Sequence, residues 1–404
     1  MSGSRRSLRP TRFLSSALAV ISLAACANDT AAPDPAAGSD AAFTHRKPLA
    51  TLEWNRLALS MIEKNKPNQQ AALRGMAYLT LAQYGAIHRA QDRRSRPAMT
   101  LGAIAGASAA VLAYLHPLDA ATFEAEVRAR ETALEPGRQA EFRAGEELGR
   151  DIGGIAVIKA KADRFDAVWT GTVPTGAGIW YSSTVPASPP SLPLLGQMRP
   201  FFMDAGDQFR PAPPPAFGSP GFLEALGEVR RISDTRTARQ DSIAKFWAMG
   251  TGTLIAGFWN TTASEIIQRR RLGEREAAHA LALMNTAAMD GLIACADAKF
   301  TYWLLRPTQA DPAITLPIGL PNFPAYPSNH ACFSGAAAYT LGALFPYERQ
   351  RLRGLAYHAG ISRVFGGIHY RFDSDVGLDI ARKVTRHVLR LDRRNRLVEF
   401  LTIG

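Results

Sequence analysis

Residues 274–307 read EREAAHALALMNTAAMDGLIACADAKFTYWLLRP, and this stretch decides the class of fold. It is rich in Ala and Leu, with apolar residues three or four positions apart, which is the pattern of a helix. We predict one long helix over residues 274–305, with Pro307 helping to end it. Lys299 and Arg306 are seven residues apart. On such a helix both would therefore face one side, about 10 Å apart along the axis, where they favour an anion or a carboxylate between them.

The same helical pattern extends over most of the chain. No alternating strand pattern is visible, and helices this numerous must bury their faces against one another. The expected fold class is therefore all-α, a helical bundle. The other predicted helices cover residues 51–64, 69–92, 102–115, 119–134, 138–162, 221–230, 236–248, 261–271, 330–344, 348–365 and 375–390.

One long segment, residues 164–220, interrupts the helices because it is crowded with Pro, Gly and Ser. A stretch of this length without regular structure is usually functional or wraps over the surface. We interpret it as a connection between an N-terminal helical half, residues 44–163, and a C-terminal half, residues 221–404. No apolar stretch is expected to be long enough for a membrane-spanning helix.

The N-terminus has the pattern of a bacterial export signal. A basic stretch precedes the apolar residues 13–23, and the sequence LAAC follows at residues 23–26. This pattern resembles a bacterial lipobox, in which the Cys is lipidated and becomes the mature N-terminus. We expect a signal peptide at residues 1–25, a flexible tether at residues 26–43, and anchoring through Cys26 to the cell envelope, facing the periplasm.

The composition restricts the partners. The formal net charge is +12, and residues 1–25 contribute four Arg and no acid, which leaves 12 − 4 = +8 for the rest. A basic surface could attract anions, but an Arg-rich solvated face explains the charge equally well. No aromatic-interleaved basic stripe or nucleic-acid motif is visible, so we expect no nucleic-acid partner. The expected membrane contact is limited to the lipid anchor.

Two cysteines remain after Cys26, namely Cys295 and Cys332. In an oxidising periplasm they could pair, since both flank the chemically informative runs. The alternative, two buried thiols on helices, is the interpretation that we favour from the sequence.

A second informative run is FPAYPSNH, residues 323–330. Ser328 precedes the predicted helix at residues 330–344 and is a natural N-cap. Free backbone N–H groups at a helix start favour an anion, and the Ser hydroxyl would add a donor. His330 would lie beside that anion and could give or take a proton near neutral pH. Taken alone, the run also fits a capping Ser beside an incidental His.

A third run is SRVFGGIHYRFD, residues 362–373. His369 and Asp373 are four residues apart, so on a helix the carboxylate can hold the imidazole. A carboxylate on one ring nitrogen fixes the tautomer and leaves the other nitrogen free as a nucleophile or a metal ligand. Arg363 offers a planar fork that suits a tetrahedral oxyanion.

In this order, the three runs resemble the superfamily shared by vanadium-dependent haloperoxidases and type 2 phosphatidic acid phosphatases. Its signatures are Lys, six residues, Arg-Pro; then Pro-Ser-Gly-His; then Ser-Arg, five residues, His, three residues, Asp. The chain matches the first and third at full spacing, and the second except at Asn329. The resemblance covers roughly residues 274–390 and implies a bundle of the vanadium chloroperoxidase and acid phosphatase type. Bundles of this family often pair, so it also allows a homodimer.

The resemblance implies a role for each matching residue. In a haloperoxidase His369 would ligate the vanadium of bound vanadate, and His330 would handle the protons of hydrogen peroxide while halide is oxidised. In an acid phosphatase, without vanadate, His369 would attack phosphorus and form a phosphohistidine, and His330 would protonate the leaving group. Asp373 would hold His369. The groups that would bind the oxyanion are Lys299, Arg306, Ser328, the backbone amide of Asn329, and Arg363.

The flanking residues favour the haloperoxidase branch, because residues 323–328 and 361–373 resemble the chloroperoxidase runs around the two histidines. The first function expected is therefore a vanadium haloperoxidase-like oxidoreductase, with vanadate as cofactor and with peroxide and halide as substrates. The alternative is a periplasmic acid phosphatase that hydrolyses phosphomonoesters. A third hypothesis, from another class, is a non-catalytic envelope binding or scaffold lipoprotein.

Two departures from the family pattern bear on the site. Asn329 replaces Gly; it keeps a backbone N–H, but its side chain would crowd the anion. Fungal chloroperoxidases also carry an Asp after a Phe-Trp-Ala run, and this Asp supports the arginine equivalent to Arg363. Here the run at residues 246–248 continues with Met249 and Gly250, so that support is missing from the sequence.

Overall fold

The computed structural model describes residues 48–92, 96–249, 252–393 and 396–401. The predicted signal peptide, the tether and Cys26 lie outside the described residues, and so does Gly250. The described residues all belong to one compact unit. The division into two helical halves, residues 44–163 and 221–404, joined by a connection at residues 164–220, remains a prediction.

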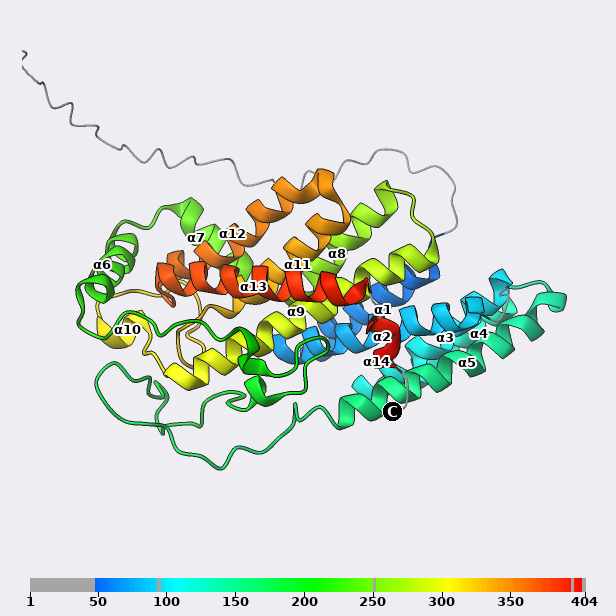
Figure 1. Cartoon of the computed structure of the whole chain (residues 1–404), viewed down its shortest axis with the longest axis horizontal. Coiled ribbons are helices and arrows are strands. Elements are labelled where there is room, and N and C mark those ends of the chain that lie inside the picture. Colours follow the sequence, from blue (N-terminus) through cyan, green and yellow to red (C-terminus); the bar gives the residue numbers. More distant parts are fainter. Residues whose placement is uncertain (1–47, 93–95, 250–251, 394–395, 402–404) are drawn as a thin grey trace, which may run out of the picture. The chain divides into compact units, whose positions relative to one another are not determined.

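The fold is all-α, as predicted (Figure 1). Within the described ranges there is no β-strand, and the only strand-like pairing is an isolated bridge between Ile179 and Leu304. The helices are α1 Ala50–Asn65, α2 Gln69–Asp92, α3 Pro97–Leu115, α4 Ala120–Thr132, α5 Pro136–Lys161, α6 Pro220–Thr235, α7 Ala238–Met249, α8 Leu254–Arg269, α9 Glu274–Tyr302, α10 Pro307–Ala310, α11 Asn329–Leu344, α12 Arg349–Phe365, α13 Arg371–Asp392 and α14 Arg396–Phe400.

Helix α9 lies at the centre of the core. It packs against α2, α11 and α13, and almost every residue from Ala277 to Ala298 is buried. This explains why α9 is apolar on all sides rather than along one stripe. Gly291 allows α9 to approach α11 closely, because a Cβ at this position would lie 3.1 Å from the carbonyl oxygen of Cys332.

We expected no apolar stretch long enough for a membrane-spanning helix, and this expectation was wrong. Two described helices, α3 and α9, are long and apolar enough to cross a membrane. In α9 the most apolar window is 94% buried inside the protein, which is the position of a core helix. In α3 the corresponding value is 61%. Glycines on α3 and α5 allow these helices to touch: a Cβ on Gly102 would lie 1.9 Å from the carbonyl oxygen of Phe142.

The Pro-rich connection is tied to α9 at several places. The buried carboxylate of Asp290 accepts hydrogen bonds from the backbone N–H groups of Phe201 and Phe202, both at 2.8 Å, and of Met203 at 3.2 Å. Near the end of α9, the N–H of Trp180 donates to the carbonyl oxygen of Trp303 at 2.7 Å. These bonds satisfy backbone groups of a segment whose helical structure is limited to two short 3-10 turns, η2 Leu195–Gln197 and η3 Gly206–Phe209.

Asp290 also makes stability depend on pH. Burial raises the pKa of Asp290 to about 7, although its three backbone hydrogen bonds lower it. A carboxyl whose folded pKa is raised stabilises the fold when protonated, below its unfolded pKa, and loses that contribution as pH rises through about 7. The free energy of unfolding of the wild type, compared with that of Asp290→Asn, should therefore fall by up to about 1.4 kcal/mol per pH unit between roughly pH 4 and 7. Urea unfolding across this range measures the difference, and parallel profiles would contradict the prediction.

Candidate functional site

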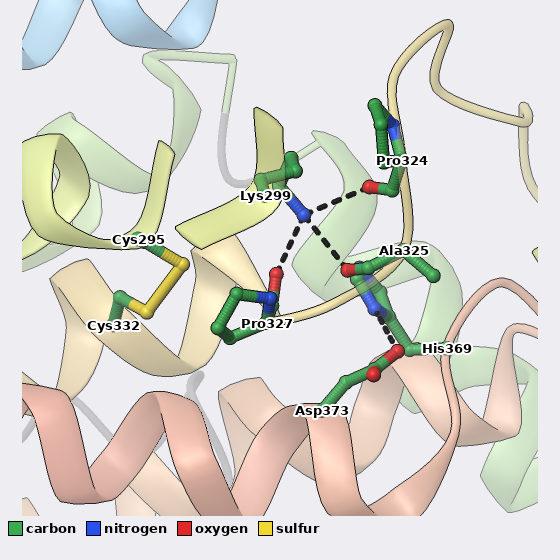
Figure 2. Close-up of a disulfide and its surroundings, with 8 residues drawn as sticks. All are labelled: Cys295, Lys299, Pro324, Ala325, Pro327, Cys332, His369 and Asp373. Atoms are coloured by element: carbon green, nitrogen blue, oxygen red, sulfur yellow. Dashed lines mark hydrogen bonds and ion pairs between the residues drawn. A yellow bond between two sulfur atoms is a disulfide. The ribbon is translucent and has the colours of Figure 1, made fainter. Parts of the chain in front are cut away.

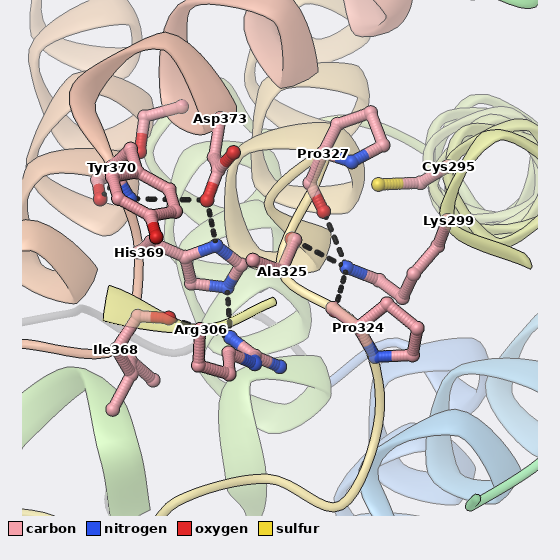
Figure 3. A network of polar contacts seen from close by, with 12 residues as sticks. Cys295, Lys299, Arg306, Pro324, Ala325, Pro327, Ile368, His369, Tyr370 and Asp373 are labelled. Carbon is pink, nitrogen blue, oxygen red and sulfur yellow. Dashed lines mark hydrogen bonds and ion pairs between the residues drawn. The ribbon is translucent and has the colours of Figure 1, made fainter. Parts of the chain in front are cut away.

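The three sequence runs meet where α9 ends and where α11 and α13 begin (Figure 3). Every side chain predicted to bind the oxyanion is buried, which is unusual for charged groups and requires partners. The exposed fractions are 1% for Lys299, 0% for Arg306, 0% for Ser328, 8% for Asn329, 2% for Arg363, 2% for His369 and 0% for Asp373. His330 is half-buried.

Lys299 holds the segment that precedes α11 by hydrogen bonds to its backbone. Its ammonium donates to the carbonyl oxygens of Pro324 at 2.8 Å, Ala325 at 2.7 Å and Pro327 at 2.6 Å (Figure 2). Burial and the nearby charge of Arg306 lower the pKa of Lys299, while Asp373 raises it. Because an ammonium has three N–H donors, these carbonyls satisfy all of them.

Arg306 lies beyond α9, so the predicted helix to residue 305 was three residues too long. The helix ends at Tyr302, Trp303 has a left-handed backbone with φ of 52°, and Leu304 pairs with Ile179. Lys299 and Arg306 therefore do not share a helix face, contrary to the prediction. Tertiary pairing with the Pro-rich connection turns the chain and directs the guanidinium into the site.

The guanidinium of Arg306 is only partly satisfied. Its Nε donates to the carbonyl oxygen of Phe323 at 2.9 Å, and its Nη1 contacts the carbonyl oxygen of Ile368 at 2.7 Å and Nε2 of His369 at 3.0 Å. Its Nη2 is buried and has no hydrogen-bond partner among the described residues. Burial lowers the pKa of Arg306 to about 10.

His369 and Asp373 form the predicted pair, but not on one helix. Helix α13 begins at Arg371, so His369 precedes it, and the carboxylate reaches back from the first turn. Asp373 Oδ2 lies 2.7 Å from His369 Nδ1 and accepts the Tyr370 N–H at 3.0 Å. Nδ1 therefore carries the proton, and Nε2 accepts from Arg306. Burial, and then the charges of Arg306 and Lys299, hold the pKa of His369 well below its usual value.

Ser328 occupies the N-cap position of α11, as predicted, but its hydroxyl does not cap the helix. The Ser328 Oγ is buried and has no hydrogen-bond partner among the described atoms, and the same holds for the side-chain oxygen of Asn329. Asn329 is the first helical residue, so the first-turn N–H groups of α11 lack intrahelical acceptors. This helix start presents donors without acceptors, which is the arrangement expected for an anion.

Arg363 is supported by α7 rather than by a carboxylate. Its Nη2 donates to the carbonyl oxygen of Ala244 at 2.6 Å, and its Nε donates to the Ser362 hydroxyl at 2.9 Å. Burial lowers the pKa of Arg363 to about 9. The carbonyl of Ala244 thus provides the support that the sequence seemed to lack, and sequence reasoning could not find it because a backbone carbonyl leaves no residue-type signal.

His330 also contacts α7. Its Nε2 lies 2.8 Å from the carbonyl oxygen of Trp247, so Nε2 carries the proton in this arrangement. Burial and the charge of Arg363 lower the pKa of His330 well below its usual value.

Sequence reasoning also missed the ring of Phe323, which lies 5.3 Å from Lys299 Nζ and 5.0 Å from the Arg306 guanidinium carbon, within cation–π range.

Cys295 and Cys332 form a disulfide between α9 and α11, so the preference for two free thiols was wrong (Figure 2). Both residues are fully buried. They are 37 residues apart in sequence, and only the packing of α9 against α11 brings their Cα atoms to 6.2 Å.

Basic side chains outnumber acidic ones among the described residues of the site. Lys299, Arg306 and Arg363 are fully buried, and the buried carboxyl beside them is that of Asp373. Burial lowers the pKa of Lys299, raises the pKa of Asp373 to about 7, and holds the pKa of both histidines well below its usual value. Buried charges require compensation. A tetrahedral oxyanion would supply negative charge and would accept from Arg306 Nη2 and the Ser328 hydroxyl, both of which lack partners. The donor set therefore fits vanadate or phosphate.

Comparisons with known proteins support the family resemblance and the fold. Residues 278–397 match the family model of the PAP2 superfamily. The chain is similar to the solved structure of the first bacterial vanadium-dependent iodoperoxidase, with a TM-score of 0.70 and 20% identity, covering 86% of this chain and 98% of that one.

Two structures of bacterial vanadium-dependent chloroperoxidase share the fold as well. The apo-type has a TM-score of 0.62 and 12% identity, covering 79% of this chain and 93% of its own. The holo-type has a TM-score of 0.64 and 14% identity, covering 82% and 93%. No curated protein sequence matches the chain. The predicted resemblance to the haloperoxidase and phosphatase superfamily is thus confirmed for the fold.

Proposed function

We propose that this chain, whose residues 278–397 match the family model of the PAP2 superfamily, is a vanadium haloperoxidase-like enzyme that binds vanadate and oxidises halide with hydrogen peroxide. The observation that carries the proposal is the excess of buried cations around His369, together with unpartnered donors on Arg306 and Ser328. Structures with the same fold are described as vanadium-dependent iodo- and chloroperoxidases, which supports this branch.

Each residue of the site would have a separate role in binding the anion or in transferring protons. Lys299, Arg306 and Arg363 would compensate the charge of the anion, and the start of α11 would donate N–H groups. Asp373 holds the Nδ1 proton of His369, so the Nε2 lone pair becomes available once Arg306 turns to the anion. Vanadate, when bound, supplies the Lewis acid that activates peroxide. His330 is the more exposed of the two histidines and would transfer protons to and from the bound reactants.

The alternative is an acid phosphatase that acts on phosphomonoesters. It requires the same donors and no cofactor, and the match to the PAP2 superfamily supports it. His369 Nε2 would attack phosphorus as a neutral, carboxylate-oriented nucleophile, and His330 would protonate the leaving alcohol. One site serves both chemistries because five-coordinate vanadate resembles the transition state of phosphoryl transfer.

One purified sample, assayed for both activities with and without orthovanadate, tests the proposal. We expect added vanadate to produce bromide-dependent halogenation of monochlorodimedone with peroxide. Hydrolysis of p-nitrophenyl phosphate that vanadate only inhibits would establish the phosphatase instead. If the sample has neither activity and binds neither vanadate nor phosphate in calorimetry, the non-catalytic envelope protein is the better description.

A further inference from the structure

We propose that the Cys295–Cys332 disulfide is a positioning device for the oxyanion site. It holds the end of α9 and the start of α11 at the separation that anion binding requires. The inference rests on the proposed function, since it concerns the geometry of the same site.

The disulfide lies to one side of the site, next to Lys299 and Pro327 (Figure 2). Cys295 precedes Lys299 by four residues on α9, and Cys332 follows Ser328 by four residues on α11. Each cysteine is therefore about one helical turn from a residue that would bind the anion, Lys299 within α9 and Ser328 at the N-cap of α11. The bond fixes the turn that carries Lys299 relative to the turn that carries Ser328.

The covalent loop also encloses most of the site. Residues 295–332 contain five of the eight predicted site residues, and the other three lie outside the loop, on α12 and around the start of α13. The enclosed five are Lys299, Arg306, Ser328, Asn329 and His330. Closing this loop restricts the conformations of the enclosed segment.

Electrostatics explain why the site needs such a constraint. Lys299 and Arg306 are both buried, and their charges repel each other when no anion lies between them. The segment at residues 324–327 is held to Lys299 by three hydrogen bonds and to Leu304 by the Ala325 N–H at 2.8 Å, and the Ser328 N–H donates to the Asp373 carbonyl oxygen at 2.9 Å; none of these contacts is covalent. A covalent bond between α9 and α11 opposes the expansion of the site that this repulsion favours. The entropic cost of ordering the site then arises when the chain folds and not when the anion binds.

The packing of the two helices is consistent with this role. One turn before Cys295, Gly291 brings α9 against α11, where a Cβ would lie 3.1 Å from both the Cys332 carbonyl oxygen and the Ala336 Cβ. The disulfide extends this contact by one turn, toward the site. Its sulfurs are shielded from solvent, and a bonded pair lacks the thiolate that peroxide oxidises.

The test measures binding of inorganic phosphate and of orthovanadate by calorimetry. The variants are the wild type, Cys295→Ala/Cys332→Ala and, to restore volume, Cys295→Val/Cys332→Ala. We expect the double variants to bind both anions about tenfold more weakly while circular dichroism shows them folded, the size typical of residues that orient a binding site. The matched control is Leu341→Ala, a buried α11 residue nine positions beyond Cys332, which should lose thermal stability and keep its affinity.

The outcomes separate the two proposals. If the wild type binds phosphate and a folded double variant binds it equally well, the positioning role is overturned and the proposed function stands. If Leu341→Ala weakens binding as much as the double variants do, or if neither double variant folds, the disulfide is only a structural tie and the inference also fails. If the wild type binds neither anion, the proposed function itself fails.

Discussion

The His369→Ala variant should lose enzymatic activity by a factor on the order of 10³ or more, whichever of the two reactions the protein catalyses. The imidazole is the only neutral, carboxylate-oriented nitrogen that the described site presents next to Arg306. Without it, neither a phosphoryl group nor vanadate has its nitrogen partner. The fold should survive, because removing a site residue rarely disrupts a large helical core. Steady-state kcat/KM and circular dichroism measure the two effects.

The matched control for this variant is His279→Ala. His279 also pairs with a carboxylate, Asp392, at 2.9 Å, but it lies near the start of α9, at the opposite end from the site. This variant should keep its activity. A His369→Ala protein that unfolds would show a structural role instead, and one that keeps a tenth of the activity would remove His369 from the mechanism.

Replacing the buried ammonium should have the second largest effect. In Lys299→Met a side chain of similar length loses its charge, so we expect phosphate to bind at least about 30-fold more weakly, which corresponds to roughly 2 kcal/mol for the loss of a buried positive charge near the anion. The carbonyl oxygens that Lys299 now satisfies would lose their donor, at about 1 kcal/mol or more each. The free energy of unfolding should therefore fall as well. Calorimetry with phosphate and urea denaturation measure both.

The control for Lys299→Met is Lys245→Met. Lys245 lies on α7 with an exposed side chain, paired with Asp241 at 2.6 Å. Exposed pairs contribute little, so this variant should match the wild type in affinity and stability. Unchanged phosphate affinity in Lys299→Met would mean that Lys299 only holds the 324–327 segment and does not contribute its charge to the anion.

The sequence predicted the helices well where local pattern decides them. The predicted first residues are within one position of the observed ones for α2, α9 and α11. Apolar spacing and capping residues determine where a helix starts, and both are visible within about four residues of sequence. The start of α13 was missed by four residues. There the carboxylate of Asp373 reaches back to the Tyr370 N–H and to His369, and this capping begins the helix earlier.

The identity of the candidate site residues also came from the sequence, because three spaced motifs in order are highly specific. Their geometry did not. The left-handed turn at Trp303 depends on pairing with Ile179, more than 100 residues away, and this pairing rather than helical spacing directs Arg306. The support of Arg363 by the Ala244 carbonyl depends on a contact 119 residues apart.

Sequence alone thus determined the helical class, the family resemblance and the residues to examine, since these follow from local periodicity and from residue types at fixed spacing. Only the tertiary structure decided that Cys295 pairs with Cys332, that Lys299 is satisfied by backbone carbonyls, and that the site buries more basic side chains than acidic ones. The physical reason is that burial and long-range hydrogen bonds depend on which helices pack together. No pattern within a few residues encodes that packing.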